Sequence, residues 1–346
     1  MKFFKDKKVF LTGHTGFKGA WAAFILKQMG AEVTGFSLQP FETSLFNILG
    51  LNEEIKSIFG DINNPDAIEK AMLETKPEIV FHMAAQAFVI PSYSDPRTTW
   101  QTNVIGTLNV FEAVRKAGTV KAMVNITTDK CYENLEWFYP YRENDRLGGH
   151  DPYSASKAGA EILSSSYRKS FLQKEGIRMA TARAGNVIGG GDFSEIRLIP
   201  NAIKSIKDGG KFYITAPEAT RPWQHVMEAL NGYFMLAEKL YTQNGYDEAF
   251  NFGPDLTGNL TVLEVISEMQ KHIPFLKYEV KIPENPLHEA KLLMLDTSLA
   301  KHKLGWKPRI TTLEGIKLTA EWYHSYLKNA EDLKELTSQQ IKKFYL

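Results

Sequence analysis

The sequence predicts an α/β protein with a doubly wound, Rossmann-like parallel sheet and a smaller C-terminal lobe. Short apolar, β-branched runs alternate with helical segments through the first half of the chain, and this order of elements builds a parallel sheet with helices on both faces. A run of glycines lies between the first apolar run and the first helical segment. The length of 346 residues exceeds what one core usually organises, which favours two lobes.

The first element is a buried strand at Lys8–Thr12, a run that contains no breaker. Gly13, Gly16 and Gly19 follow at once, and an apolar helical segment then runs to Gly30. Glycines with this spacing allow a tight turn, let backbone N–H groups approach a pyrophosphate and let the helix pack closely, with its positive end toward the phosphates. The order predicts a dinucleotide-binding turn, and a glycine-rich turn that binds nothing is the alternative.

The composition is that of an ordinary globular enzyme, with 43% hydrophobic and 23% charged residues. A formal net charge of +1 without a basic or acidic block gives no reason to expect nucleic acid or an anionic membrane as a partner. The single cysteine, Cys131, excludes an internal disulfide framework and fits a cytoplasmic protein. We expect no signal peptide, no membrane-spanning stretch and no metal site.

The second and third strands indicate the nucleotide end of the site. After the strand at Glu32–Phe36 comes Ser37 rather than the acidic residue that often holds the adenosine ribose. No arginine follows at once that would favour a 2′-phosphate, so NAD is expected rather than NADP. After the strand at Lys56–Phe59, Asp61 could hydrogen-bond an adenine and Ile62 could pack against it. A turn or helix-cap aspartate is the alternative for Asp61.

The fourth strand is expected at Pro77–Ala85, where the near-continuous apolar character fits a strand covered on both faces. The small residues Ala84 and Ala85 would let the backbone lie against the cofactor. His82 fits a packed, hydrogen-bonded histidine better than a catalyst.

The polar run that follows the fifth strand is where the fold places its chemistry. A helix is expected at Thr98–Lys116, in which Gly106 indicates close packing, and the fifth strand follows at Lys121–Thr127. It leads into Thr127–Tyr132, which carries hydroxyl, carboxylate and ammonium groups. Ligands of doubly wound folds bind beyond the carboxyl ends of the strands.

A helix that opens at Asp151 places Tyr153 and Lys157 four residues apart and therefore on one side. A lysine ammonium beside a phenol favours the phenolate, so we expect Lys157 to lower the pKa of Tyr153. The phenol would then take a proton from a sugar hydroxyl while a hydride leaves for a nicotinamide. Lys157 would also hold the nicotinamide ribose. The spacing alone is common by chance, but after a glycine-rich turn and four more strands it is a strong indication.

These motifs together resemble the extended short-chain dehydrogenase/reductase family over nearly the whole chain. They are T-G-H-T-G-F-K-G at Thr12–Gly19, G-D-I at Gly60–Ile62, H-M-A-A-Q at His82–Gln86, N-V-I-G-T at Asn103–Thr107 and Y-S-A-S-K at Tyr153–Lys157. Longer runs resemble the CDP-D-glucose 4,6-dehydratase branch, namely T-T-D-K-C-Y-E-N at Thr127–Asn134, Y-R-E-N-D at Tyr141–Asp145, R-A-G-N-V-I-G-G-G-D at Arg183–Asp192 and R-P-W-Q-H-V at Arg221–Val226.

The resemblance implies one tightly held NAD and a nucleotide-diphosphate sugar, expected to be CDP-glucose. The implied cofactor-binding residues are Gly13, Thr15, Gly16, Phe17, Lys18, Gly19, Asp61, Ile62, Ala84, Ala85, Asn103, Tyr153 and Lys157. The implied substrate-binding residues are Gln86, Asn186, Arg197, Arg221 and His288, of which the arginines suit a diphosphate. The implied catalytic residues are Thr128, Asp129, Lys130, Tyr153 and Lys157.

The resemblance also implies a 4,6-dehydratase reaction, in which C4 of the sugar is oxidised, water is lost across C5 and C6, and the hydride returns to C6. Many such enzymes carry an Asp-Glu pair for the elimination, and the matching positions here are Asp129 and Lys130. A neutral Lys130 would remove the C5 proton, a protonated Asp129 would assist loss of the C6 hydroxyl, and Thr128 would hydrogen-bond the C4 oxygen. A surface salt bridge is the alternative for the pair.

The second half of the chain reads mainly as a substrate lobe. We assign residues 1–185 to the dinucleotide-binding domain, which also receives a strand and a helix near 221–255, and residues 186–346 mainly to the substrate lobe. A sixth strand at Arg178–Arg183 leads into a glycine-rich loop that would line the cleft. His225 could lie in the pocket or be structural. Thr261 and Glu264 have capping-box spacing and predict a helix start.

Some alternatives stay open at this point. Ile90 stands where the CDP-glucose branch usually has an arginine, so another nucleotide sugar could be the substrate. A C4 epimerase or other dehydrogenase would share the cofactor site but would not need Asp129 and Lys130, and a non-catalytic NAD-binding regulator would not need the intact catalytic set. A homodimer or tetramer is expected, paired through the helices at 98–116 and 153–172.

Overall fold

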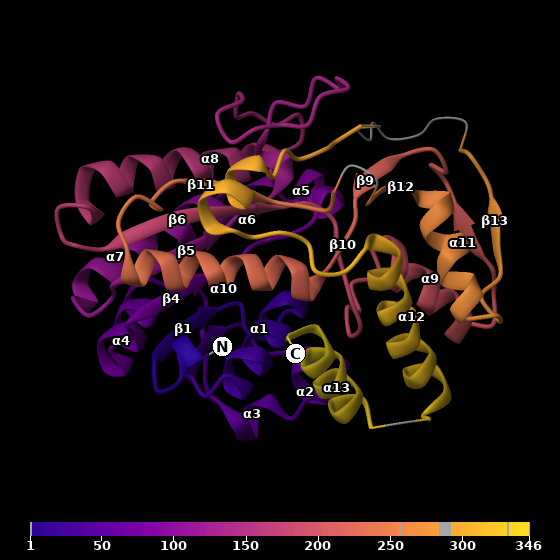
Figure 1. Ribbon diagram of the computed structural model, residues 1–346, viewed down its shortest axis with the longest axis horizontal. Helices are drawn as coiled ribbons and strands as arrows, with labels where there is room; N and C mark the ends of the chain where they lie inside the picture. Colours follow the sequence, from indigo (N-terminus) through magenta and orange to yellow (C-terminus); the bar gives the residue numbers. More distant parts are fainter. Residues whose placement is uncertain (1, 256–257, 284–291, 331, 346) are drawn as a thin grey trace.

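A fully parallel sheet of seven strands forms the centre of the structure (Figure 1). The computed structural model describes residues 2–255, 258–283, 292–330 and 332–345. The strand order is β11-β6-β5-β4-β1-β2-β3, with bounds β1 Lys8–Thr12, β2 Glu32–Ser37, β3 Lys56–Phe59, β4 Ile79–His82, β5 Ala122–Ile126, β6 Arg178–Ala184 and β11 Ala249–Phe252. The order reverses between β1 and β4, and this is where a doubly wound sheet opens a crevice for ligands.

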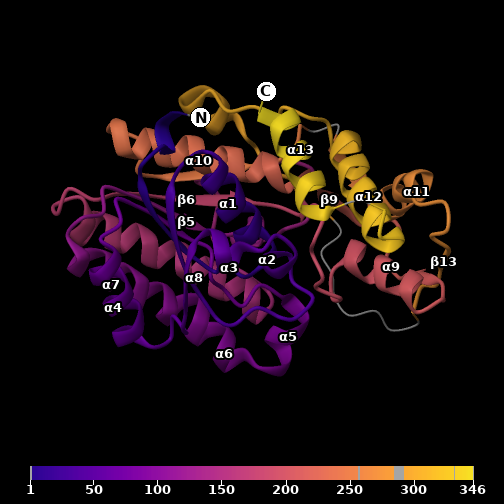
Figure 2. The same cartoon turned by 90° about the horizontal axis from the view of Figure 1, so that it is seen from below.

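Helices cover both faces of the sheet (Figure 2). Val9 and Leu11 of β1 belong to the core on one face, whereas Phe10 between them belongs to the core on the other. This alternation explains why the strands read as unbroken apolar runs. The first face packs against α1 (Phe17–Gln28) and α10 (Val226–Thr242), and the second against α4 (Pro65–Thr75), α7 (Thr107–Ala117) and α8 (Pro152–Tyr167). The predicted doubly wound fold is confirmed.

Local caps set where several helices begin. The Asp151 carboxylate accepts a hydrogen bond of 2.9 Å from the Ser154 N–H, and Pro152 takes the first helical position of α8. The predicted capping box is confirmed, because Thr261 and Glu264 cap each other at the start of α11 (Val262–His272). Tyr153 is therefore held in the first turn of α8, at the edge of the sheet where the strands end.

The helix expected at 98–116 is confirmed, with a π-helical turn inside it. The segment consists of α6 (Pro96–Trp100), a π-helical turn at Gln101–Gly106 and then α7. The expected close packing of Gly106 is confirmed, since a Cβ there would lie 2.7 Å from Cδ1 of Ile62. A π-helical turn accommodates an extra residue without ending the helix, and sequence periodicity alone does not reveal it.

The second lobe lies to the right of the sheet in Figure 1. It contains α9 (Leu198–Lys207), α11, α12 (Thr312–Lys328), β8 (Phe212–Ile214), β9 (Thr220–Pro222), β12 (Asn259–Thr261) and β13 (Tyr278–Val280). The last helix, α13 (Leu333–Tyr345), returns toward the first lobe, where Gln28 donates a hydrogen bond of 3.2 Å to Ser338. In the described part of the chain, no helix combines the length and apolarity that a membrane crossing requires.

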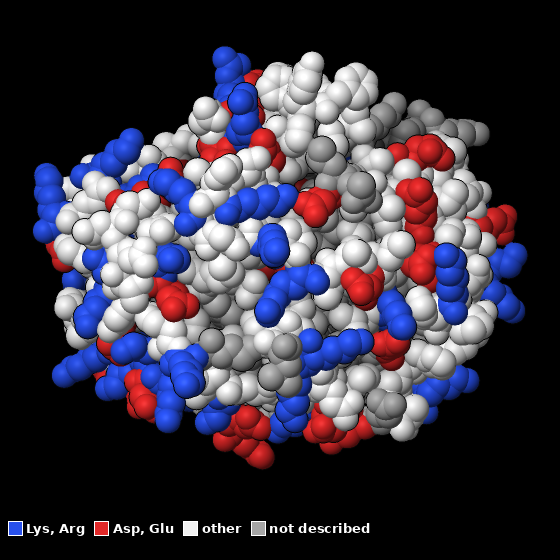
Figure 3. Space-filling model, viewed as in Figure 1, with Lys and Arg blue, Asp and Glu red and all other residues white. Residues whose placement is uncertain are grey.

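The remaining elements are short connections. They are the helices α2 (Leu45–Ile48), α3 (Leu51–Glu54) and α5 (Val89–Ser94), the 3₁₀ turns at Lys2–Phe4 and Asp129–Cys131, the π-helical turns at Arg168–Leu172 and Ala300–Leu304, and the paired strands β7 (Val187–Ile188) and β10 (Gln224–His225). Figure 3 shows Lys and Arg side chains interspersed with Asp and Glu over the visible face, in keeping with the net charge of +1.

Candidate active site

The glycine-rich turn is packed tightly on one side and open on the other. Gly13 has a φ of +77°, and a Cβ there would lie 2.8 Å from the Ala84 nitrogen. A Cβ at Gly19 would collide with the carbonyl oxygen of Gly13. Gly16, the exposed N-cap of α1, has only that oxygen in Cβ range, at 3.4 Å. The first N–H groups of α1 have no partner within the helix, so this open side fits a dinucleotide pyrophosphate.

Hydroxyl groups occupy the end of β2, where an acidic residue is often found. Thr15 donates a hydrogen bond of 3.0 Å to the Leu38 carbonyl oxygen, and its hydroxyl lies 2.8 Å from that of Ser37. The half-buried Thr15 therefore ties the glycine-rich turn to the end of β2.

Asp61 and Ile62 lie at the end of β3. The Asp61 carboxylate accepts a hydrogen bond of 2.9 Å from the Asn63 N–H, which is the turn-aspartate alternative. Ile62 is buried and packs against Gly106. These contacts shape the turn after β3, and both residues stay predictions as adenine contacts.

His82 is a packed structural histidine, as expected. Its Nδ1 lies 2.7 Å from the Thr12 hydroxyl and its Nε2 lies 3.0 Å from the Thr107 hydroxyl. Burial, with the charge of Lys157, lowers its pKa to about 3, so the ring is neutral. The Ala84 N–H donates to the same Thr12 hydroxyl at 3.1 Å, which holds the Ala84–Ala85 turn beside β1.

The side chains of Asn103 and Gln86 form hydrogen bonds with other groups of the protein. The side-chain oxygen Oδ1 of Asn103 accepts a hydrogen bond of 2.9 Å from the main-chain N–H of Gln86. The side-chain Nδ2 of Asn103 donates to the main-chain carbonyl oxygen of Gln86 at 3.0 Å and to the Ser156 hydroxyl at 2.9 Å. The Gln86 amide donates to Thr99 at 3.0 Å. Because the polar atoms of Asn103 are taken, the structure favours a role in holding the Gln86 turn against α8.

The reactive segment, Thr128–Lys130, begins a 3₁₀ turn directly after β5. The Thr128 hydroxyl donates a hydrogen bond of 3.0 Å to Asp129 Oδ1 and accepts one of 3.3 Å from the Lys130 N–H. Asp129 is only 2% exposed, so the alternative of a surface salt bridge is excluded. Burial raises the pKa of Asp129, against the opposing charge of Lys130. Burial therefore favours the protonated form of Asp129, which is the form that can donate a proton.

Tyr153 lies beside this segment, but the expected effect of Lys157 on its pKa is wrong. Burial raises the pKa of Tyr153 to about 12, and the groups that oppose this are a hydrogen bond with Thr128 and the charge of Arg197. Lys157 instead donates a hydrogen bond of 3.2 Å to the Ile126 carbonyl oxygen at the end of β5. Burial lowers the pKa of Lys157 to about 8.

Cationic side chains converge on the same place. Arg197 pairs with the buried Asp192 at 2.9 Å and lies over the Phe88 ring at 5.1 Å from its centroid. Burial, together with the charges of Arg197 and Lys157, lowers the pKa of the half-buried Lys18 to about 7. Cationic side chains gathered in this way favour an anion such as a diphosphate.

The glycine-rich loop after β6 borders the reactive segment. A Cβ at Gly185 would lie 3.1 Å from Asp129 Oδ2. Arg221 is buried, donates 2.7 Å to the Thr220 carbonyl oxygen and is among the charges that act on Asp129. The half-buried Asn186 follows Gly185 in this loop. His225 is structural, since it caps α10 by accepting from the Met227 N–H at 3.3 Å.

The structure thus brings most of the predicted polar residues together around Asp129 and Tyr153, and it places the others elsewhere. Those within electrostatic reach of one another are Lys18, Thr128, Asp129, Lys130, Tyr153, Lys157, Arg197 and Arg221. Asp61 and Ile62 form the turn after β3. His288 lies outside the described residues.

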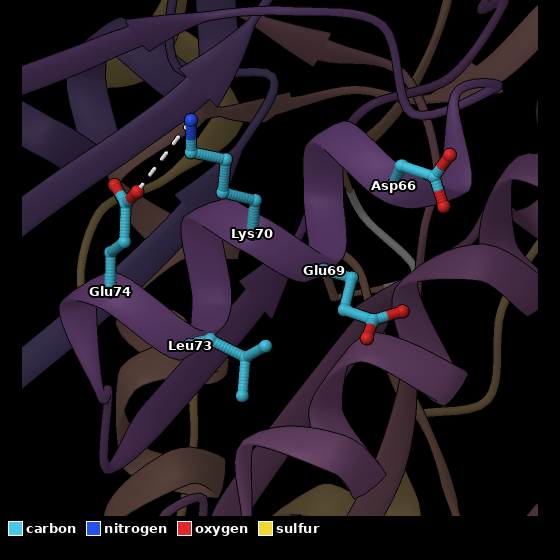
Figure 4. A pocket seen from close by; sticks show the side chains of 5 residues that line it. All are labelled: Asp66, Glu69, Lys70, Leu73 and Glu74. Carbon is cyan, nitrogen blue, oxygen red and sulfur yellow. Dashed lines mark ion pairs between the residues drawn. The ribbon is translucent and has the colours of Figure 1, made fainter.

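Asp192 is a site residue that sequence reasoning did not single out. It holds Arg197, and its signal was available as the last residue of the run R-A-G-N-V-I-G-G-G-D. A separate shallow pocket on the surface of α4 contains no predicted site residue (Figure 4), being lined by Asp66, Glu69, Lys70, Leu73 and Glu74.

Comparison with known proteins finds relatives over nearly the whole chain. A family model described as GDP-mannose 4,6 dehydratase matches residues 10–319. The CDP-glucose 4,6-dehydratase of Salmonella typhimurium is 42% identical over 99% of this chain and 97% of that protein. The dTDP-glucose 4,6-dehydratase of Shigella flexneri is 24% identical over 96% of this chain and 97% of its own length.

Solved structures show the same fold. A dTDP-glucose 4,6-dehydratase from Bacillus anthracis, solved in complex with NAD, has a TM-score of 0.77 at 23% identity and covers 95% of this chain and 99% of its own. A UDP-glucose 4-epimerase from Thermotoga maritima has a TM-score of 0.80 at 24% identity, covering 92% and 99%. The expected resemblance is confirmed, and this chain belongs to the GDP-mannose 4,6 dehydratase family, within the extended short-chain dehydrogenases/reductases.

Proposed function

We propose that this protein is an NAD-dependent nucleotide-sugar 4,6-dehydratase that converts CDP-glucose to CDP-4-keto-6-deoxyglucose. The observation that carries the proposal is the placement of a buried carboxyl and a lysine, Asp129 and Lys130, beside Tyr153 at the carboxyl ends of the strands. The 42% identity with the Salmonella CDP-glucose 4,6-dehydratase over nearly the full length of both chains supports it.

The cofactor end of the proposed site is made by the glycine-rich turn and the N-terminus of α1. The fit rests on the open Gly16 face and on the tight packing of Gly13 and Gly19. Serine and threonine hydroxyls at the end of β2, with no basic residue between positions 37 and 55, favour NAD over NADP. Bound NAD would supply the carbon that accepts a hydride from C4 and returns it to C6.

In this proposal Tyr153 and Thr128 handle the C4 hydroxyl. Tyr153, in its phenolate form, accepts the hydroxyl proton as C4 is oxidised, and the Thr128 hydroxyl hydrogen-bonds the same oxygen. The charge of Arg197 favours the phenolate of Tyr153. Lys157, held on the Ile126 carbonyl, orients the nicotinamide ribose.

Asp129 and Lys130 divide the elimination between them. The C4 ketone acidifies the C5 hydrogen, which a neutral Lys130 removes as a base. Asp129, whose pKa burial raises, protonates the departing C6 hydroxyl so that it leaves as water. An epimerase has no use for either group, because its C5–C6 bond does not change.

Substrate binding is proposed to depend on Arg197 and Arg221, which bind the diphosphate of the sugar nucleotide. Phe88 supports Arg197, although the run Phe88–Ile90 departs from the branch pattern. Ile90 is 56% exposed on α5. This position therefore carries an apolar side chain where the branch usually has the positive charge of an arginine.

Incubation with CDP-glucose, dTDP-glucose and GDP-mannose in deuterated water tests the proposal. We expect a 4-keto-6-deoxy product with deuterium at C5, formed fastest from CDP-glucose. A C4 epimer without C5 deuterium would identify an epimerase instead, and bound NAD without any turnover of the three sugars would support a regulator.

We also propose a homodimer paired through α6, α7 and α8. Trp100, Ile105 and Ile162 are large apolar side chains left exposed on this side of the molecule, with Ile162 at 60%. Light scattering of the purified protein would test it, with Ile162→Glu expected to shift the mass toward a monomer, and an unchanged mass counting against this face.

A further inference from the structure

A buried ion pair lies behind the reactive segment. Glu161 is on α8, four residues beyond Lys157, and its side chain is 3% exposed. Its Oε2 accepts hydrogen bonds of 2.8 Å from Arg183 Nη2 and 2.8 Å from the Thr181 hydroxyl, both on β6. Its Oε1 accepts from the hydroxyl of Thr127. The Arg183 side chain is 4% exposed.

The same ion pair holds both flanks of the reactive segment. Thr127, which binds Glu161, directly precedes Thr128. On the other flank, Arg183 Nη1 lies 2.8 Å from the Tyr132 hydroxyl oxygen, to which it donates, and its guanidinium lies 5.0 Å from the centre of the Tyr132 ring. Tyr132 in turn donates 2.7 Å to Asn251 on β11.

We propose that the Glu161–Arg183 pair is a clamp that fixes both ends of the reactive segment relative to Tyr153 and Lys157. Glu161 and Arg183 are positioning residues, since each acts through neighbours rather than by touching the sugar. The proposal rests on the proposed dehydratase function. It adds Glu161, which lies outside the quoted motifs, and gives a role to Arg183, the first residue of the run R-A-G-N-V-I-G-G-G-D.

A charged pair is a costly way to fill this space. Two buried charges lose their hydration, and apolar side chains of similar volume often stabilise a fold equally well. The pair has something specific to hold, however, because the Thr127 and Tyr132 hydroxyls need polar partners in the interior. Misplacement of a reacting group by about 1 Å can cost about 100-fold in rate, so fixing both flanks affects catalysis directly.

Glu161 also acts on Lys157 electrostatically. Burial opposes ionisation of Glu161, but the charge of Arg183 and the surrounding hydrogen bonds hold its pKa below the usual value. The resulting carboxylate raises the pKa of Lys157 against burial. Among the described residues, the other titratable groups that interact electrostatically with Lys157 are Cys131 after β5, His82 on β4 and Lys18 on α1. Tyr153 lies four residues before Lys157 on the same helix.

The test separates positioning from stability. Glu161→Leu and Arg183→Met each leave an unpaired buried charge, and both are expected to lower the melting temperature, whereas the double variant removes both charges and recovers much of it. We expect the double variant to keep a kcat for CDP-glucose about 10- to 100-fold below wild type, with KM changed less than about threefold. Recovery of kcat together with stability would overturn the clamp.

A matched control is the partly exposed ion pair, 2.7 Å long, between Arg115 near the C-terminus of α7 and Glu175 in the turn before β6. The Arg115→Met/Glu175→Leu double variant should leave kcat and KM unchanged.

Two further measurements test the clamp even if Glu161→Leu fails to fold or if the substrate is a nucleotide sugar other than CDP-glucose. Glu161→Gln keeps the side-chain volume, and removal of its charge lowers the pKa of Lys157, so the alkaline limb of the kcat profile should move to lower pH. Amide hydrogen exchange over residues 127–132 should be faster in Glu161→Gln, and in the double variant if it folds, than in wild type, whatever the activity. Wild-type exchange in these variants would refute the clamp, whereas wild-type protein that turns over no nucleotide sugar would refute the proposed function alone.

Discussion

Gly16→Ala is expected to weaken NAD binding while leaving the fold intact. Gly16 has a φ of −78°, which alanine adopts without strain, and the nearest atom to the new Cβ would be the Gly13 oxygen at 3.4 Å. Alanine is a poorer N-cap than glycine, so the free energy of unfolding should fall by about 1 kcal/mol or less. The methyl group would project from the open side of the turn, where the pyrophosphate binds.

The expected loss of affinity follows from the hydrogen bonds at stake. A hydrogen bond to a charged group contributes about 1.5–3 kcal/mol. If the new methyl group displaces the phosphate from one α1 N–H group, the variant should bind NADH about 10- to 150-fold more weakly than wild type. Fluorescence titration with NADH, beside urea unfolding, measures both quantities. Gly19→Ala is the contrasting variant, because its Cβ would collide with the Gly13 oxygen and both stability and binding should fall. Wild-type NADH affinity in Gly16→Ala would refute this placement of the pyrophosphate.

Three other predictions concern the chemistry and one buried acid. Lys130→Met should still allow C4 oxidation, detected as bound NADH at 340 nm, but should stop exchange of the C5 proton with deuterated water, and undiminished exchange would remove Lys130 from that role. Tyr153→Phe should lower kcat by about 10²- to 10⁴-fold through loss of the base, with little change in CDP-glucose affinity by calorimetry; a kcat within threefold of wild type would contradict it. Burial raises the pKa of Glu228 from 4.5 to about 7, so the fold favours its protonated form and wild type loses stability as the pH rises from about 4.5 to 7. Glu228→Gln removes that loss, and its stability relative to wild type should increase by roughly 3 kcal/mol between pH 4.5 and 8 in urea unfolding, whereas a pH-independent difference would contradict the raised pKa.

The parts of the fold that could be predicted are those that local chemistry determines. Strands β1, β4 and β5 are buried on both faces, so each reads as an apolar run whatever its neighbours are. Asp151 caps α8 through its own side chain, and Thr261 and Glu264 cap α11, so these helix starts follow from sequence spacing. The reactive segment was predictable because it directly follows such a strand.

The parts that could not be predicted depend on contacts between distant residues. The π-helical turn before α7 brings Gly106 against Ile62, which lies far away in the sequence. The raised pKa of Tyr153 depends on burial, and the spacing to Lys157 says nothing about it. Asn103 carries a family motif, yet its amide is used by Gln86 and Ser156.

The central claim is that one hydride moves from C4 to C6 of the same sugar within this site. CDP-glucose carrying deuterium at C4 should give a 4-keto-6-deoxy product with that deuterium at C6, when a mixture with unlabelled substrate is turned over by wild-type protein and analysed by mass spectrometry and NMR. Retention at C4 in an epimerised or unchanged sugar, or loss of the label to solvent, would contradict the claim.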